Sequence, residues 1–123
     1  MPRKPSTKPS AAPLRRSPCP VACGLDLFGD KWTLLIIRDL ILGRSRFKDF
    51  VESPEGIPTN ILSDRLERLL DCGVVQQIPA ADGSKRLAYQ LTDKGAALRP
   101  ILRAIRDWGL KWESGTCANL EEK

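Results

Sequence analysis

The chain of 123 residues contains no histidine, one methionine and few aromatic residues. Without histidine it lacks the commonest general base and the commonest metal ligand. Cys19 and Cys23 are separated by three residues, which is neither the close spacing nor the four-ligand set of a structural zinc site. The sequence also shows no glycine-rich phosphate loop and no paired carboxylates in an evident cleft. We therefore predict no enzymatic activity, no metal and no cofactor.

Long apolar runs are also absent. The best candidate, residues 32–42, is interrupted by Arg38 and Asp39 and is too short to span a membrane. The basic N-terminus has no apolar stretch behind its charges, so it does not have the pattern of a secretory signal. The sequence predicts a cytoplasmic protein that does not contact a membrane, with its cysteines reduced.

The positive charge is concentrated at one end of the chain. The net charge is +5, and residues 1–18 hold five basic and no acidic residues, so the 15 basic and 15 acidic residues of 19–123 cancel. Residues 1–18 are also rich in proline, and we predict a disordered basic arm there. It either contacts DNA phosphates or is simply solvated. A folded domain over 19–114 and a short tail over 115–123 follow.

The middle of the chain has the pattern of a helix-turn-helix followed by a two-stranded wing. Residues 46–51 predict a short amphipathic helix, and 58–71 predict a second helix with leucines at helical spacing. Within 74–91, apolar segments flank an Asp-Gly turn, which is typical of a β-hairpin. The predicted fold is therefore mostly α with a small β-hairpin wing, an arrangement that presents its second helix to the DNA major groove.

Further helices are predicted on both sides of this unit. The first begins near Pro20 and ends at Gly29, and an almost wholly apolar helix over 31–42 is expected at the centre of the domain. Thr92 is placed to cap a last helix over 93–114.

An apolar stripe follows this last helix. It carries two tryptophans, more than one small domain needs to cover, so we expect the stripe and the first helix to form a homodimer interface. The alternative is that the stripe packs on its own core. The predicted interface residues are Leu98, Ile101, Leu102, Ile105, Trp108 and Trp112.

The second helix of the motif begins with short hydrogen-bonding side chains. Asparagine can read adenine with two hydrogen bonds, and arginine can read guanine in the same way. We expect the base-facing residues to be Thr59, Asn60, Ser63 and Arg65, with Arg68 contacting bases or phosphate. We expect Arg46, Lys85 and Arg86 to contact phosphate or the minor groove. The alternative is that both surfaces are merely solvated and charged.

Several stretches of the chain resemble the HxlR-type bacterial winged-helix regulators. The matching residues are 19–21, 25–32, 34–40, 46–47, 56–66, 89–92 and 95, and the resemblance runs from 19 to about 113. The Cys-Pro-Val start joined to Gly-Asp-Lys-Trp is quite specific to this family. The resemblance implies a transcription factor whose first and last helices hold a homodimer on a roughly palindromic operator. It assigns no role to the long basic arm.

Cys19 precedes the first helix, whose dipole would stabilise a thiolate there. Buried cysteine otherwise behaves as a small apolar residue. The resemblance implies more, because some members of the family sense electrophiles or oxidants through an N-terminal cysteine that corresponds to Cys19. Neither Cys23 nor Cys72 can be assigned as its partner.

Together these features predict a sequence-specific regulator that binds double-stranded DNA, with no effector identified. The competing interpretation is a winged-helix protein-interaction module that never touches DNA, and the neutrality of residues 19–123 favours it.

Overall fold

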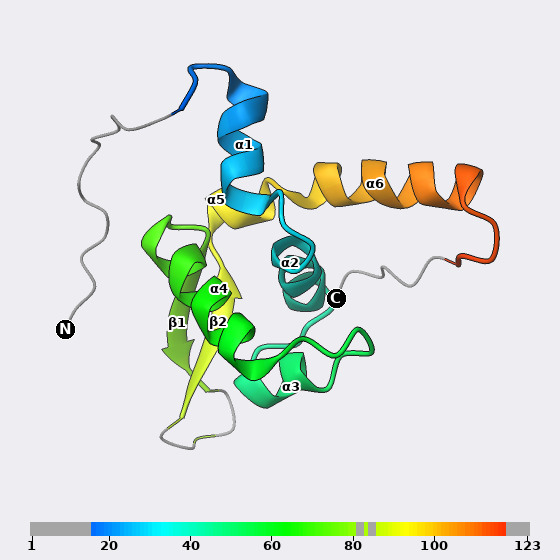
Figure 1. The fold of residues 1–123 in the computed structure, drawn as a ribbon. Coiled ribbons are helices and arrows are strands. Elements are labelled where there is room, and N and C mark those ends of the chain that lie inside the picture. Colours follow the sequence, from blue (N-terminus) through cyan, green and yellow to red (C-terminus); the bar gives the residue numbers. More distant parts are fainter. Residues whose placement is uncertain (1–15, 81–82, 84–85, 118–123) are drawn as a thin grey trace.

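A computed structural model describes residues 16–80, 83 and 86–117 of the chain. In chain order the elements are α1 Pro20–Phe28, α2 Thr33–Ile41, α3 Phe47–Val51, α4 Thr59–Asp71, β1 Val75–Pro79, β2 Leu87–Leu91, α5 Asp93–Ala96 and α6 Arg99–Trp112. Figure 1 shows α2, α3, α4 and the two strands gathered into one body, from which α1 and α6 project in different directions. The predicted mostly helical fold with a two-stranded wing is confirmed. Most of the predicted N-terminal arm lies outside the described residues.

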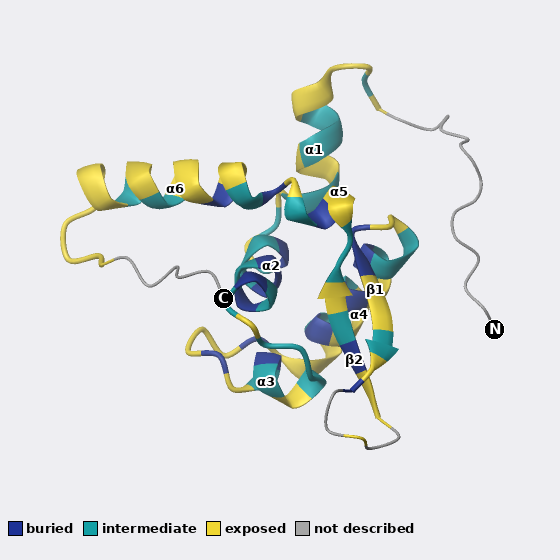
Figure 2. Ribbon diagram, turned by 180° about the vertical axis from the view of Figure 1, so that it is seen from behind, coloured by how far each residue is buried: buried dark blue, intermediate teal, exposed yellow. Residues whose placement is uncertain are grey.

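The hydrophobic core lies between α2, α3, α4 and the sheet (Figure 2). Its fully buried side chains include Ile37 of α2, Phe50 of α3, Leu62 and Leu69 of α4, and Val74 just before β1. As predicted, α2 is the central element, since Ile36, Ile37 and Ile41 are all buried. No helix among the described residues is both long enough and apolar enough to cross a membrane.

Helix α4 forms where its leucines predict it. Pro58 precedes its first turn, and Leu62, Leu66 and Leu69 are buried at intervals of three and four residues. This spacing places them on one face of a helix, so the opposite face is turned to solvent. The chain leaves the helix through Gly73, whose φ of 77° is a left-handed conformation suited to glycine.

The wing is a two-stranded antiparallel sheet in which Val75 pairs with Leu91 and Pro79 with Leu87. A backbone hydrogen bond of 2.8 Å from the Tyr89 amide to the Ser45 carbonyl attaches β2 to the loop before α3. The Tyr89 ring also meets the Phe50 ring edge-on, with ring centres 6.1 Å apart. The wing is therefore held against the helix-turn-helix.

The end of the chain differs from our prediction of one helix over 93–114. Thr92 does cap a helix, because its side chain accepts a hydrogen bond from the Gly95 amide, but that helix is the short α5. A second helix, α6, then begins at Arg99. Pro100 explains the break, since proline has no amide proton to donate to the preceding turn and its ring would clash there. It is tolerated in the first turn of α6.

Candidate nucleic-acid interface

The first turns of α4 expose three short polar side chains, Thr59, Asn60 and Ser63. Asn60 lies on the face opposite Leu62 and Leu66, Ser63 lies on the adjoining flank, and Thr59 is exposed in the first turn on the leucine side. The burial of these leucines fixes the rotation of the helix about its axis. The start of a recognition helix is where base edges are commonly contacted. Hydroxyl and amide groups of this length can donate and accept hydrogen bonds there.

The two arginines of α4 turn toward the protein's own α1–α2 corner. The Arg65 Nε lies 2.9 Å from a carboxylate oxygen of Asp30, and Arg65 also pairs with neighbouring Asp64. Arg68 donates to the carbonyls of Asp26 and Leu27, at 3.1 and 3.4 Å. Both guanidinium groups thus have partners within the chain. Their contacts to DNA stay a prediction.

The remaining predicted DNA contacts lie at α3 and at the wing. Arg46 is half-buried just before α3, where its amide donates to the Asp49 carboxylate at 3.0 Å. Burial works against ionisation of Asp49, but the amides of Arg46 and Ser45 outweigh it and lower its pKa. Arg86 is exposed beside β2. Lys85 lies outside the described residues.

A buried charge network joins α2 to the turn of the helix-turn-helix. Asp39 is only 2% exposed and accepts hydrogen bonds from Arg38 at 2.9 Å, from Arg44 at 3.0 Å, and from Ser53. The Arg38 guanidinium also donates two hydrogen bonds to the Glu55 carboxylate, of 2.7 and 2.8 Å. The hydrogen bonds from Arg38 lower the pKa of Glu55. The network holds the turn that orients α4.

Sequence reasoning did not identify this network. The sequence feature that points to this network is the Arg38-Asp39 pair, which interrupts the apolar run of α2. In the sequence analysis this pair served only to exclude a membrane span. A buried carboxylate needs partners. Nothing local, however, points to Ser53, 14 residues further on.

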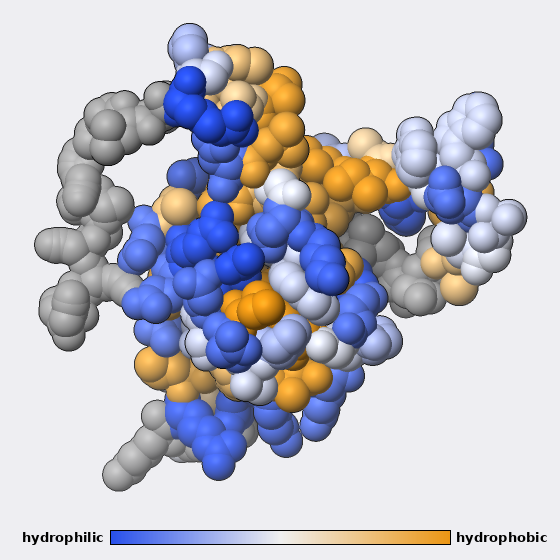
Figure 3. Space-filling model, viewed as in Figure 1, coloured by the Kyte–Doolittle hydropathy of each residue, from blue (hydrophilic) through white to orange (hydrophobic). Residues whose placement is uncertain are grey.

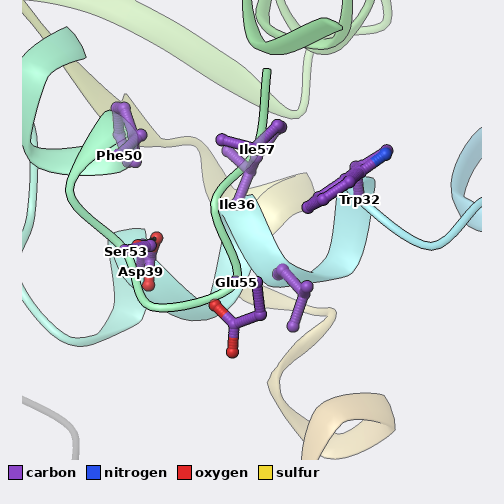
Figure 4. Close-up of a pocket in the computed structure, with 8 residues that line it drawn as sticks. Trp32, Ile36, Asp39, Phe50, Ser53, Glu55 and Ile57 are labelled. Atoms are coloured by element: carbon purple, nitrogen blue, oxygen red, sulfur yellow. Dashed lines mark hydrogen bonds between the residues drawn. The ribbon is translucent and has the colours of Figure 1, made fainter. Parts of the chain in front are cut away.

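A small hollow lies beside this network, between α2, α3 and the following turn (Figure 4). Its wall is largely apolar, with Trp32, Ile36 and Ile57 on one side of the Asp39–Ser53 pair. Its enclosed space is only about 10 Å³. That is roughly the room that a single water molecule needs. We assign it no ligand.

Cys19 is the residue immediately before α1, and its side chain is exposed. Its amide donates to the Ser17 hydroxyl at 3.1 Å, and its carbonyl accepts from the Cys23 amide at 3.0 Å. Cys23 is half-buried, with its Sγ 3.5 Å from the Ser17 carbonyl. The four cysteines all lie within the described residues, and each is a free thiol. Cys19 is thus open to reagents from solution.

The structure divides the predicted dimer stripe in two. Leu98 and Leu102, each 8% exposed, pack into the protomer's own core. The rest of the stripe is uncovered, with exposure rising from 36% at Ile101 to 63% at Trp112. Ile105 and Trp108 lie between these values.

Helix α1 adds Val21 and Leu25 to this uncovered apolar surface. Figure 3 shows hydrophobic surface running from α1 onto the adjoining part of α6. An uncovered patch of this kind on a small protein is typical of an interaction surface.

Comparison with known proteins gives a consistent result. The family model described as HxlR-like helix-turn-helix matches residues 27–116. The chain is 31% identical over 107 residues to the HTH-type transcriptional regulator YodB of Bacillus subtilis, covering 85% of this chain and 96% of YodB. The YodB structure in its reduced form superimposes with a TM-score of 0.65, at 28% identity, over 80% of this chain and 98% of that one.

Two other solved structures are similar. PA1607, crystallised as a candidate transcription factor, has a TM-score of 0.77 and 43% identity, over 89% of this chain and 78% of its own. The redox regulator HypR, in its reduced form, has a TM-score of 0.66 and 30% identity, over 74% of this chain and 90% of its own. YodB has also been solved bound to a quinone.

The match covers α2, the helix-turn-helix, the wing and all of α6. The predicted resemblance and the prediction that the chain is not an enzyme are confirmed, since the relatives are transcriptional regulators. The chain belongs to the HxlR-like helix-turn-helix family of transcriptional regulators.

Proposed function

We propose that the protein is a sequence-specific regulator that binds a pseudo-palindromic DNA operator as a homodimer. The observation that carries the proposal is the exposure of Thr59, Asn60 and Ser63 at the start of a helix whose core-facing side is fixed by buried leucines. Such a helix can enter the major groove without rearranging the core. Because its ligand is chromosomal DNA, we place the protein in the bacterial cytoplasm.

The proposed dimer rests on the uncovered apolar surface of α1 and α6. A homodimer with two-fold symmetry presents two copies of α4, and such pairs read half-sites about one helical turn apart. Arg46, Lys85 and Arg86 are assigned to phosphate or minor-groove contacts, which hold the protein in register on the duplex. They add affinity without reading sequence.

Replacing Asn60 by alanine is expected to weaken binding to the operator by roughly 5- to 150-fold, the range for losing one good bidentate base contact. Binding to random duplex should be unchanged. The measurement is a mobility-shift titration on the promoter region beside the protein's own gene, with competitor DNA. Arg86→Ala is the control, since loss of a phosphate contact weakens all sequences alike. Equal losses on both duplexes for Asn60→Ala would refute its reading role.

An interaction module without DNA binding remains the competing function, and the zero net charge of residues 19–123 favours it. The two functions differ in their response to salt. DNA binding through phosphates releases counterions, so its affinity falls steeply as salt rises. A flat salt dependence, or no binding to any duplex, would support the interaction module.

We further propose that Cys19 senses electrophiles. The thiol is exposed at the start of α1, the helix whose apolar face we assign to the dimer. YodB, a relative, has been solved with a bound quinone, and HypR is named a redox regulator. Addition of the Cys19 thiolate to a quinone ring carbon forms a sulfur–carbon bond, and a proton then reaches the ring oxygen. This adduct would place new bulk beside α1.

A quinone is expected to change operator affinity of the wild type severalfold and to leave that of Cys19→Ser unchanged. Intact-mass measurement on the same samples should show an adduct on the wild type. The matched controls are Cys72→Ser and Cys117→Ser, which remove exposed thiols elsewhere and should respond as the wild type does. An identical response of Cys19→Ser and the wild type would remove Cys19 from the mechanism.

A further inference from the structure

Two arginines fasten the recognition helix α4 to the corner between α1 and α2. Arg65 reaches from the middle of α4 to Asp30, with 2.9 Å between Nε and the carboxylate oxygen. One turn further on, Arg68 donates to the carbonyls of Asp26 and Leu27. These contacts join residues that are 35 and about 41 positions apart in the chain. We call Asp30, Arg65 and Arg68 the clamp.

The Asp30 carboxylate is itself held rigidly. It accepts hydrogen bonds from the amides of Trp32 and Thr33, at 3.0 and 3.1 Å, and from the Thr33 hydroxyl at 2.6 Å. Burial favours its neutral form, but the bonds from Thr33 and Arg65 outweigh burial, and the pKa of Asp30 is far below its usual value. The carboxylate is therefore charged at any physiological pH. Arg65 meets an anchored anion instead of a mobile surface group.

The second half of the clamp acts on the end of α1. Asp26 and Leu27 lie in its last turn, where the carbonyls have no partners within the helix. A cation is favoured at this negative end of the helix dipole. Arg68 thus ties α4 to the same helix that carries Cys19 at its start and the exposed Val21 and Leu25 along its side.

We propose that Asp30, Arg65 and Arg68 are positioning residues that set the orientation of α4 relative to α1. The inference rests on the proposed function and deepens it. In a dimer assembled through α1 and α6, the clamp determines the separation of the two α4 helices, and therefore which half-site spacing the protein prefers. Thr59, Asn60 and Ser63 read the bases, while the arginines of the same helix hold it in place.

This role can be distinguished from direct base contact by Arg65. If Arg65 reads a base, removing the charge of Asp30 releases the guanidinium from this anchor and leaves it only its exposed neighbour Asp64, so operator binding stays equal or improves. If Arg65 positions α4, removing Asp30 has the same effect as removing Arg65. The double variant is then no worse than either single one, because both changes break one interaction.

The experiment compares Asp30→Asn, Arg65→Gln and the double variant with the wild type. Asparagine still accepts the hydrogen bonds that begin α2. Affinities are measured on the operator, on operators with one base pair added or removed between half-sites, and on random duplex. We expect each single variant to lose about tenfold on the operator, within the range of measured couplings between contacting residues. We also expect its preference for the native spacing to shrink, a change that mere destabilisation would not produce.

Asp26→Asn is the matched control. It removes the carboxylate that pairs with Arg16 in the same corner, but keeps the main-chain carbonyl that Arg68 contacts. This variant should behave as the wild type does. Urea unfolding of every variant identifies any that fail to fold, and Arg65→Lys, which keeps the charge without the planar group, replaces Arg65→Gln in that event.

The outcomes separate the clamp from the proposed function. Wild-type protein that binds no duplex would overturn the proposed function, and the clamp's DNA role with it. If the wild type binds its operator and Asp30→Asn binds with the same affinity and the same spacing preference, the clamp is overturned and the proposed function stands. Weaker binding by Arg65→Gln with unchanged or tighter binding by Asp30→Asn would assign Arg65 to base contact.

Discussion

Replacing Gly95 by alanine is expected to lower the free energy of unfolding by about 3 kcal/mol, the upper part of the range for overpacking a core. A Cβ at this position would lie 2.2 Å from the Val74 carbonyl oxygen and 2.8 Å from a Leu91 methyl carbon. The Val74 oxygen cannot retreat freely, because it accepts hydrogen bonds from the amide and the hydroxyl of Thr92. Helix α5 would have to move away from the root of the wing.

Urea unfolding monitored by circular dichroism measures the effect. Gly109→Ala in α6 is the matched control, since outside its own helix no atom lies within 4 Å of a Cβ there. Alanine favours a helix by up to about 1 kcal/mol over glycine, so this variant should be neutral or slightly more stable. An unfolding free energy for Gly95→Ala within about 0.5 kcal/mol of wild type would show that α5 relaxes easily.

The elements of the fold were predicted well where a local pattern determines them. The leucines of α4 recur at helical spacing, and β1 and β2 pair as predicted because the two strands lie close together in the sequence. The prediction was wrong at the end of the chain. The apolar stripe continues across Leu98 and Leu102, and periodicity alone cannot distinguish one long helix from two helices separated at Pro100.

The site was predicted in part for the same reason. The solvent-facing position of Asn60 and Ser63 follows from the burial of the leucines beside them, whereas Thr59 is exposed because it lies in the first turn of the helix. The partners of Arg65 and Arg68 do not follow from any local pattern, because Asp30 and the end of α1 are brought close only by tertiary packing. From the sequence alone, an arginine on the exposed side of a helix is predicted to be available for DNA. The carboxylate that binds Arg65 is identified only in the folded structure.

Replacing Trp108 by glutamate is expected to convert the dimer to a monomer and to weaken operator binding by about 100-fold or more, the usual loss when two linked sites become one. Trp108 is 59% exposed in the protomer, so the substitution removes little from the protomer's own core. In the proposed dimer it would bury a charge without a partner, which is costly. Tryptophan is also enriched among residues that dominate interface energies.

Sedimentation velocity at micromolar concentration gives the assembly state, circular dichroism verifies that the protomer stays folded, and mobility shift gives the affinity. Leu110→Glu is the matched control, because Leu110 is an exposed apolar residue of the same helix. It lies two positions on, about 200° around the axis from Trp108. If Leu110→Glu stays dimeric while Trp108→Glu is folded but monomeric, the interface lies on the face of α6 that carries Trp108. Ile105 and Trp108 are mostly exposed in the protomer, whereas Leu102 packs into its core, so the dimer is the structural role that we assign to them. A wild-type protein that sediments as a monomer at micromolar concentration would contradict that assignment.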